Sequence, residues 1–167
     1  MADPLILTLW LDDKSFAWLD NLRQRHFPDR GYRLPAHLTL FHKLPGDRLE
    51  RIEADLSSLC AQTEPFEMQV AEVLDFSPGA AFRFDSARLK ELRATLADHW
   101  AEDLSAQDKG FRPHVTVQNK VPAEESVYDT LAQGFTPFTA TAEGLLLWHY
   151  RGGPWEAAGR YRFGGIE

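Results

Sequence analysis

The spacing of apolar and polar residues along the chain predicts alternating strands and helices. The apolar run from Leu5 to Leu11 predicts a buried strand. Apolar residues then recur at helical spacing behind Asp12 or Asp13, either of which can cap a helix that ends before Pro28. A loop follows, and His37 to Phe41 predict a short second strand. The first part of the chain is therefore expected to fold as strand, helix, loop and strand.

The rest of the chain carries the same kinds of pattern. Asp47, with Glu50 three residues later, predicts the start of a second helix. The other expected elements are strands at 66–73, 81–84 and 114–118, a third helix capped by Asp85 or Ser86, a fourth helix at about 123–131, and a closing hairpin of 138–150 with 155–163.

One order of elements occurs twice. A strand, a helix, a long loop and a strand beginning His-x-Thr occur at residues 5–41 and again at 81–118. The loops also end alike, as Tyr-Arg-Leu-Pro at 32–35 and Phe-Arg-Pro at 111–113. We therefore predict an α+β fold of two pseudo-symmetric lobes, each an antiparallel sheet with flanking helices, around a central cleft. No linker separates the lobes, so residues 1–167 are expected to form one two-lobed domain.

Composition narrows the classes of partner. Apolar residues make up 44% of the 167 residues and charged residues 26%, as expected of a soluble globular protein. The formal net charge of −7 argues against broad non-specific binding of nucleic acid but allows a locally basic cleft. The N-terminal apolar run lacks the basic start of a signal peptide, and no apolar stretch approaches the ~20 residues of a membrane span. We expect a cytoplasmic monomer with no membrane partner.

The two His-x-Thr-x motifs carry the candidate chemistry. They read His37-Leu38-Thr39-Leu40 and His114-Val115-Thr116-Val117. Because side chains alternate along a strand, the histidine and threonine of each motif share one face, while the apolar pair anchors the strand in its lobe. Pseudo-symmetry would then bring two imidazoles and two hydroxyls to one cleft.

Such a set of side chains suits phosphodiester chemistry that needs no metal. Free histidine has a pKa near about 6.5, so a neutral imidazole can accept a proton from the attacking oxygen while an imidazolium protonates the leaving oxygen. The threonine hydroxyls can donate to the non-bridging phosphate oxygens. A single His-x-Thr is a weak signal, and two surface histidines are the plain alternative. Two copies at equivalent points of a repeat favour catalysis.

No metal or cofactor is expected at this site. His42 lies five residues after His37, an odd offset that puts the two on opposite faces of a regular strand. The sequence has no HExxH, no paired Cys-x-x-Cys and no carboxylate cluster beside the histidines. It also lacks a Walker loop and a GxGxxG sequence, which argues against an ATP-driven ligase.

Five further residues are candidate substrate contacts. Phe41 and Gln118 continue the two motif faces, where Phe41 could stack on a base or pack at the floor of the cleft. Arg33 and Arg112 lead into the motifs and could attract a phosphate, with solvated loop charges as the simpler interpretation. Tyr150, on a late strand, could be a platform for a base, with core or edge packing as the alternative.

At the two motifs the chain resembles the 2H phosphoesterase superfamily, and in particular its bacterial 2′–5′ RNA ligase-like and cyclic phosphodiesterase branch. The resemblance implies a cleft between two antiparallel sheets and metal-independent action on 2′,3′-cyclic phosphates or 2′–5′ phosphodiester linkages. It carries His37 and His114 over as the acid–base pair, without saying which is the acid, and Thr39 and Thr116 as the phosphate-binding pair. In this family, opening of a cyclic phosphate commonly leaves a 2′-phosphate, and some members join tRNA halves reversibly.

Two classes of function stay open at this point. The favoured class is a phosphodiesterase whose substrate is a nucleotide or an RNA end, with reversible 2′–5′ RNA ligation as a further activity. The other is a non-catalytic module that binds nucleotides or RNA ends in the same cleft. The net charge of −7 and the lack of a long basic insertion favour a nucleotide or a short oligonucleotide end over a large RNA.

Overall fold

The computed structural model describes residues 2–29, 31–32 and 34–164. Its helices and strands are, in chain order, β1 (Leu5–Leu11), α1 (Asp13–His26), β2 (Thr39–Leu44), α2 (Leu49–Ala61), β3 (Phe66–Asp75), β4 (Gly79–Asp85), α3 (Ala87–His99), β5 (His114–Asn119), α4 (Tyr128–Gly134), β6 (Phe138–Tyr150) and β7 (Trp155–Arg162). Short 3₁₀ helices lie at Gly46–Arg48, Ala101–Asp103, Ala106–Asp108 and Ala123–Glu125.

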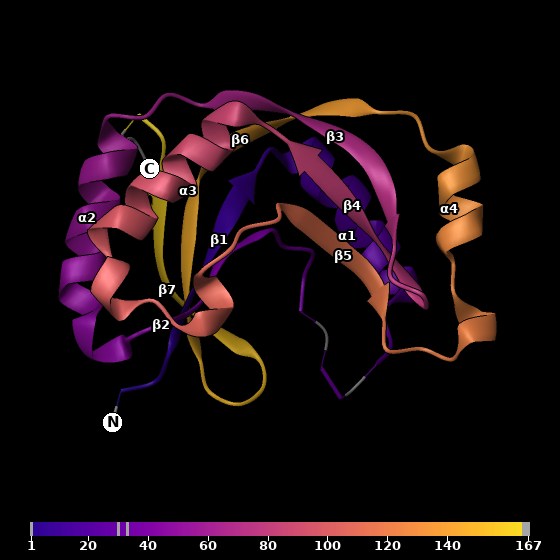
Figure 1. Cartoon of the computed structure of the whole chain (residues 1–167), viewed down its shortest axis with the longest axis horizontal. Helices are drawn as coiled ribbons and strands as arrows, with labels where there is room; N and C mark the ends of the chain where they lie inside the picture. Colours follow the sequence, from indigo (N-terminus) through magenta and orange to yellow (C-terminus); the bar gives the residue numbers. More distant parts are fainter. Residues whose placement is uncertain (1, 30, 33, 165–167) are drawn as a thin grey trace.

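Within these residues, the seven strands form one antiparallel sheet. Its order is β2-β1-β6-β3-β4-β5, with β7 paired to β6 (Figure 1). The long strands β6 and β3 pair with each other and so join the half that contains β1 and β2 to the half that contains β4 and β5. The predicted α+β class is confirmed, and the strands of the two halves are continuous through this one sheet.

Helices α1 and α3 each pack on the half of the sheet that does not contain the strand before them in the chain. Helix α1 follows β1 but packs on β5. Helix α3 follows β4, yet Trp100 at its C-terminal end meets Phe41 of β2 edge to face, with ring centroids 5.2 Å apart. Figure 1 accordingly shows α3 beside α2 at one end of the molecule and α4 at the other. This exchange of helices ties the two halves together.

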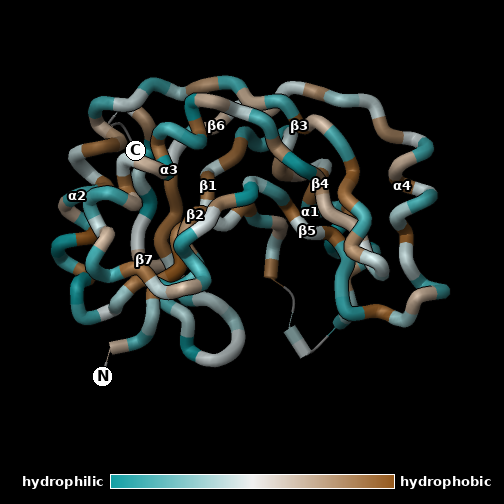
Figure 2. The backbone as a smooth tube through the Cα atoms, in the orientation of Figure 1, coloured by the Kyte–Doolittle hydropathy of each residue, from teal (hydrophilic) through white to brown (hydrophobic). Residues whose placement is uncertain are grey.

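The core follows from the alternation that the sequence shows. Buried apolar side chains from the strands and from one face of each of α1, α2 and α3 form one cluster. Hydrophilic and hydrophobic segments alternate along the outer helices in Figure 2, as expected of helices with one buried face. Among the described residues, no helix is both long and apolar enough to cross a membrane.

Two of the predicted helix starts are confirmed and two are wrong. Asp12 caps α1 and Ser86 caps α3 through side-chain oxygens that accept backbone N–H groups at 3.0 and 3.1 Å. Helix α2 begins without a side-chain cap, because the 3₁₀ turn at Gly46–Arg48 precedes it. The predicted fourth helix is divided into a 3₁₀ turn and α4, because the side chain of Gln118 binds the backbone between them.

Candidate active site

The two His-x-Thr motifs meet at an antiparallel bridge between Leu38 and Val115. Residues on either side of such a bridge face each other in crossed order, so each motif histidine lies opposite the threonine of the other motif. Leu38 and Val115 are fully buried on one face, and alternation sends the histidines and threonines to the other. The bridge therefore brings β2 and β5, which stand at the two ends of the sheet order, to one site.

All four motif side chains line one small cavity. Its volume is about 150 Å³, and its lining residues are Ile6, His37, Thr39, His42, His114, Thr116 and Trp155. Pockets that hold a whole drug-sized ligand usually have a volume of about 300–1,000 Å³. The cavity therefore fits a phosphate group and its ester oxygens, with the rest of a substrate lying outside it.

Both imidazole rings are oriented by the carbonyl two residues before them. Nδ1 of His37 lies 2.8 Å from the carbonyl oxygen of Pro35, and Nδ1 of His114 lies 2.6 Å from that of Arg112. A carbonyl oxygen only accepts hydrogen bonds, so each Nδ1 carries the proton that it donates. Nε2 is then the nitrogen of each ring that can exchange a proton with a substrate.

The environment of His37 keeps its ring neutral. The pKa of His37 is lowered to about 4, first by burial and then by the positive charge of Arg23, with smaller contributions from His42 and His114; the hydrogen bond to Pro35 opposes the shift. Near neutral pH, Nε2 of His37 therefore has a free lone pair, which is the state required of a general base.

Each motif histidine also has an aromatic neighbour. The ring of His37 lies 4.6 Å from that of Trp155, between centroids, and the ring of His114 lies 6.0 Å from that of Phe76. Trp155 begins β7 and Phe76 follows β3, so different parts of the chain supply the two aromatic walls. Together with the carbonyl contacts, these walls limit the rotation of both imidazoles.

A β-bulge directly after the first motif threonine corrects one predicted contact. Thr39 and Phe41 pair with adjacent residues of β1, so Leu40 is an extra residue in β2. The bulge turns Phe41 away from the face of His37, and its ring is fully buried against Trp100. Phe41 is therefore a core residue and not a substrate contact.

The second motif has a matching bulge, which corrects the prediction for Gln118. Thr116 and Gln118 pair with adjacent residues of β4, so Val117 is the extra residue. The Gln118 amide donates to the carbonyl of Glu125 and accepts from the N–H of Val127, both at 2.9 Å. Gln118 is 4% exposed, and it holds the segment before α4 instead of contacting substrate.

The first bulge also brings a third histidine to the site. His42 lines the cavity with both motif histidines, although a regular strand would turn it away. Its Nδ1 lies 3.2 Å from Oδ1 of the buried Asp108, whose carboxylate also accepts the N–H groups of His42 and Lys43 at 2.7 and 2.9 Å. Burial raises the pKa of Asp108, but these hydrogen bonds outweigh it and hold that pKa below its usual value. Asp108 is therefore an anion that fixes the His42 ring.

Two other predicted contacts, Arg112 and Tyr150, are not among the residues that line the cavity. The side chain of Arg112 is exposed. Its backbone carbonyl oxygen, and not its guanidinium, contacts His114. Tyr150 is 41% exposed at the end of β6 and does not line the cavity. Arg33 lies outside the described residues. Across residues 2–164, leaving out 30 and 33, no three His, Cys, Asp or Glu side chains are grouped so as to hold a metal ion.

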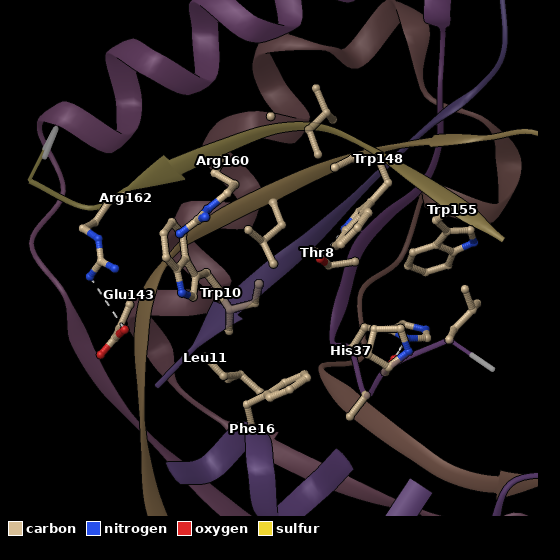
Figure 3. A pocket seen from close by; sticks show the side chains of 18 of the residues that line it. Thr8, Trp10, Leu11, Phe16, His37, Glu143, Trp148, Trp155, Arg160 and Arg162 are labelled. Atoms are coloured by element: carbon tan, nitrogen blue, oxygen red, sulfur yellow. Dashed lines mark hydrogen bonds and ion pairs between the residues drawn. The ribbon is translucent and has the colours of Figure 1, made fainter. Parts of the chain in front are cut away.

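A larger groove opens beside the cavity and shares His37 and Trp155 with it. Its volume is about 680 Å³. Figure 3 shows His37, Trp155 and Trp148 at one end of this groove, and Trp10 with two arginines at the other. Sequence reasoning missed this groove, because its lining combines β1, the start of α1 and the loop before β2 with the β6–β7 hairpin, which lies more than 100 residues further along the chain.

Comparison with known proteins gives a match to one family by sequence and several matches by structure. The sequence profile of the 2′-5′ RNA ligase superfamily matches residues 11–154. A search of curated proteins finds no significant match.

Several solved structures share the fold at low sequence identity. The protein TT0787 of Thermus thermophilus superimposes with a TM-score of 0.70 and 19% identity, over 98% of this chain and 100% of that one. E. coli LigT complexed with 3′-AMP gives 0.57 and 18%, over 98% and 99% of the two chains. A structure described as a phosphoesterase gives 0.62 and 16%, over 96% and 98%.

Proposed function

The chain belongs to the 2′-5′ RNA ligase superfamily of 2H phosphoesterases, and from this premise we propose that it is a metal-independent phosphodiesterase. Its proposed substrates are 2′,3′-cyclic phosphates or 2′–5′ phosphodiester linkages of RNA ends or nucleotides. The observation that carries the proposal is the convergence of two imidazoles and two threonine hydroxyls on one phosphate-sized cavity. The 3′-AMP complex of E. coli LigT, which has the same fold, supports a nucleotide as the ligand.

In the proposed reaction His37 is the general base and His114 the general acid. Water attacks the phosphorus of a 2′,3′-cyclic phosphate while Nε2 of His37 takes the proton that water loses. The bond from phosphorus to the 3′-oxygen breaks, and that oxygen takes a proton from Nε2 of His114. The products are a 2′-phosphate and a free 3′-hydroxyl, and exchange with solvent returns both rings to their starting states.

The lowered pKa of His37 supports this division of roles. A ring that is neutral near neutral pH can accept a proton, and with its pKa lowered to about 4 it is a poor reservoir of protons to donate. His114 is then the ring available to carry the proton for the leaving oxygen. Thr39 and Thr116 would donate to the two non-bridging oxygens, where negative charge is held in the transition state.

The test is phosphorus NMR of a 2′,3′-cyclic mononucleotide incubated with the protein in EDTA. We expect a 2′-phosphate signal from the native protein and none from the His37→Ala or His114→Ala variant. The matched control is His99→Ala, since His99 is exposed on α3 and its Nδ1 also bonds a backbone carbonyl, that of Thr95, at 2.8 Å.

Three results would count against the proposal. Full turnover in either motif-histidine variant would show that His37 and His114 do not act as the acid–base pair. Turnover that stops on adding EDTA would show that the reaction needs a metal ion. Binding of nucleotides without any product, from cyclic phosphates and 2′–5′-linked dinucleotides alike, would identify a binding module in place of an enzyme.

A further inference from the structure

The groove beside the cavity lies on one open face of three neighbouring strands. In the register of β1 with β6, Thr8 pairs with Leu146 and Trp10 with Gly144. In the register of β6 with β7, those same β6 residues pair with Arg160 and Arg162. Directly paired residues of antiparallel strands point to the same face, so two continuous rows of side chains cross the groove.

A glycine at the centre of the second row lets its two ends touch. A Cβ on Gly144 would lie 3.0 Å from Cε3 of Trp10 and 2.3 Å from the carbonyl oxygen of Tyr161. With no side chain there, the indole of Trp10 reaches across β6 to the arginines of β7. The guanidinium carbons of Arg160 and Arg162 lie 4.5 and 4.4 Å from the centroid of that ring. Stacking on an indole holds a guanidinium in place and leaves its N–H groups free to donate.

The charges around this end of the groove single out Arg160. Arg162 is paired with Glu143 at 3.8 Å, and Asp13 also lines the groove. In the described part of the chain, no carboxylate lies within 4.0 Å of the Arg160 guanidinium. Arg160 is exposed, in a protein whose net charge is −7. It is therefore the cation of the groove best placed to receive an anion.

The other end of the groove is aromatic and adjoins the reacting groups. Trp155 touches His37, and the ring of Trp148 lies 6.0 Å from that of Trp155. The indole N–H of Trp148 donates to the Thr8 hydroxyl at 2.9 Å, which fixes the ring on the open face. Stacking on such rings is how proteins commonly hold unpaired bases without reading their sequence.

The two ends are too far apart to bind the same phosphate. Ile6 lines the cavity and Trp10 lines the far end of the groove. Four residues of a strand span about 13 Å. A substrate phosphate that contacts Arg160 would therefore be a second phosphate, separated from the reacting one by at least part of a nucleotide.

We propose that this groove holds the nucleotides next to the reacting phosphodiester, so that the preferred substrate is a short single-stranded oligonucleotide whose neighbouring phosphate contacts Arg160. The inference rests on the proposed phosphodiesterase function and selects a substrate class for it. An oligonucleotide supplies both of the features that the groove would recognise, which are bases for the indoles and a second phosphate for the guanidinium.

The experiment compares kcat/KM for three substrates that end in the same 2′,3′-cyclic nucleotide: the bare nucleotide, its 5′-phosphate, and a short oligoribonucleotide. We expect the oligonucleotide to be the best substrate of the native protein. Arg160→Gln should lower kcat/KM for the oligonucleotide about tenfold, the effect of losing one charge-assisted hydrogen bond, and leave the bare nucleotide unchanged. Arg160→Lys should restore part of the loss, and Arg88→Gln, on α3 outside the groove, should have no effect.

The salt dependence of oligonucleotide binding is an independent test of the contact between Arg160 and a phosphate. Loss of one phosphate contact should reduce the slope of log affinity against log salt for a single strand by about 0.7. Equal loss of activity on all three substrates in Arg160→Gln, or no preference for the oligonucleotide, would overturn the inference and leave the proposed function standing. Full gain from the 5′-phosphate alone would also overturn it, because a mononucleotide with a second phosphate would then fill the groove as well as an oligonucleotide does.

If none of the three cyclic phosphates is turned over and 2′–5′-linked dinucleotides are not cleaved either, the proposed function fails, and binding alone decides the inference. A fluorescein-labelled oligoribonucleotide with a 2′-phosphate end would then be titrated with the native protein and with Arg160→Gln. Weaker binding in the variant supports the groove as an oligonucleotide site. Absent binding, or binding that does not depend on Arg160, rejects it.

Discussion

Arg23 and Arg93 make matching crossed hydrogen bonds from the two halves of the molecule. Arg23, on α1, donates from Nε to the carbonyl of Leu34 at 2.9 Å and from Nη1 to the carbonyl of Thr116 at 2.7 Å. It thus contacts the loop before the first motif and the strand of the second. Both arginines are about 5% exposed or less.

Arg93, on α3, reverses this arrangement. It donates from Nε to the carbonyl of Leu40 at 3.0 Å and from Nη2 to the carbonyl of Asp108 at 2.7 Å, with Gly110 at 3.3 Å. It thus contacts the strand of the first motif and the loop before the second. Each arginine thus links one motif strand to the loop before the other motif.

Replacing Arg93 by methionine should lower the free energy of unfolding by about 3 kcal/mol, because it leaves buried carbonyl groups without donors. Urea unfolding followed by circular dichroism measures the loss. The matched control is Arg88→Met, on the same helix, where the arginine side chain is 39% exposed and the change should be within about 0.5 kcal/mol. Equal stability of the two variants would contradict a linking role for Arg93.

The stability of the native protein should fall as the pH drops from about 6.5 to about 4. In this range the unfolded chain protonates its histidines at the ordinary pKa of 6.5, whereas the pKa of His37 is lowered to about 4 in the fold. The unfolded state binds more protons, so acid favours it, by at most about 3 kcal/mol from this group. The contribution is fully present above pH 6.5 and is lost by about pH 4.

The variant His37→Asn isolates this effect, since asparagine does not titrate. Urea midpoints of both proteins would be measured across the same pH range. The difference between them should change steadily between pH 6.5 and pH 4 and stay constant above that range. A difference that does not depend on pH would mean that His37 titrates alike in both states.

His42→Gln should shift the acid side of the pH–rate profile toward higher pH. His42 is among the groups whose charge lowers the pKa of His37, so removing it lets that pKa rise and His37 becomes protonated sooner as the pH drops. We also expect kcat/KM at pH 7 to fall about tenfold, the effect of losing one charge-assisted hydrogen bond to the phosphate.

The pH–rate profile separates this effect from general damage to the fold. His99→Gln, on exposed α3 surface, is the control and should leave the profile in place. If the acid side of the pH–rate profile stays at the same pH in His42→Gln, then His42 lines the cavity without changing the pKa of His37. Asp108 is left intact because it also holds two backbone N–H groups of β2.

Thr39→Val and Thr116→Val should each reduce kcat by about 100-fold while the fold persists. Valine keeps the shape of threonine but cannot donate to a phosphate oxygen, and loss of one such donor costs on this order in the transition state. Steady-state kinetics on a cyclic nucleotide measures the effect. Thr95→Val, on the exposed face of α3, is the control. Wild-type rates in both motif variants would mean that the threonines are not the phosphate donors.

Local patterns predicted the elements and the site's main parts. The apolar run Leu5–Leu11 predicted β1, and candidate caps at Asp12 or Asp13 and at Asp85 or Ser86 predicted the starts of α1 and α3. The repeated order of elements predicted that His37 and His114 would meet, and both line the cavity. The strand and the helix starts depend on neighbours within a few residues, and the repeat is visible in the order of these local patterns.

The predictions that failed depended on a strand being regular. Phe41 and Gln118 were expected on the motif faces, and His42 on the opposite face, because side chains alternate in an unbroken strand. One extra residue after each motif threonine reversed all three. Nothing in the printed residues marks Leu40 or Val117 as that extra residue, because a bulge is fixed by pairing with the neighbouring strand.

By itself, the sequence determined which residues can form strands and helices, and that two His-x-Thr faces exist. Only the tertiary structure decided which other residues surround those two faces. The exchange of α1 and α3 between halves, the Asp108 carboxylate behind His42, and the row from Trp10 to Arg162 all join residues far apart in the chain. The physical reason is that such contacts form only when the whole sheet closes and buries its core, so no local pattern encodes them.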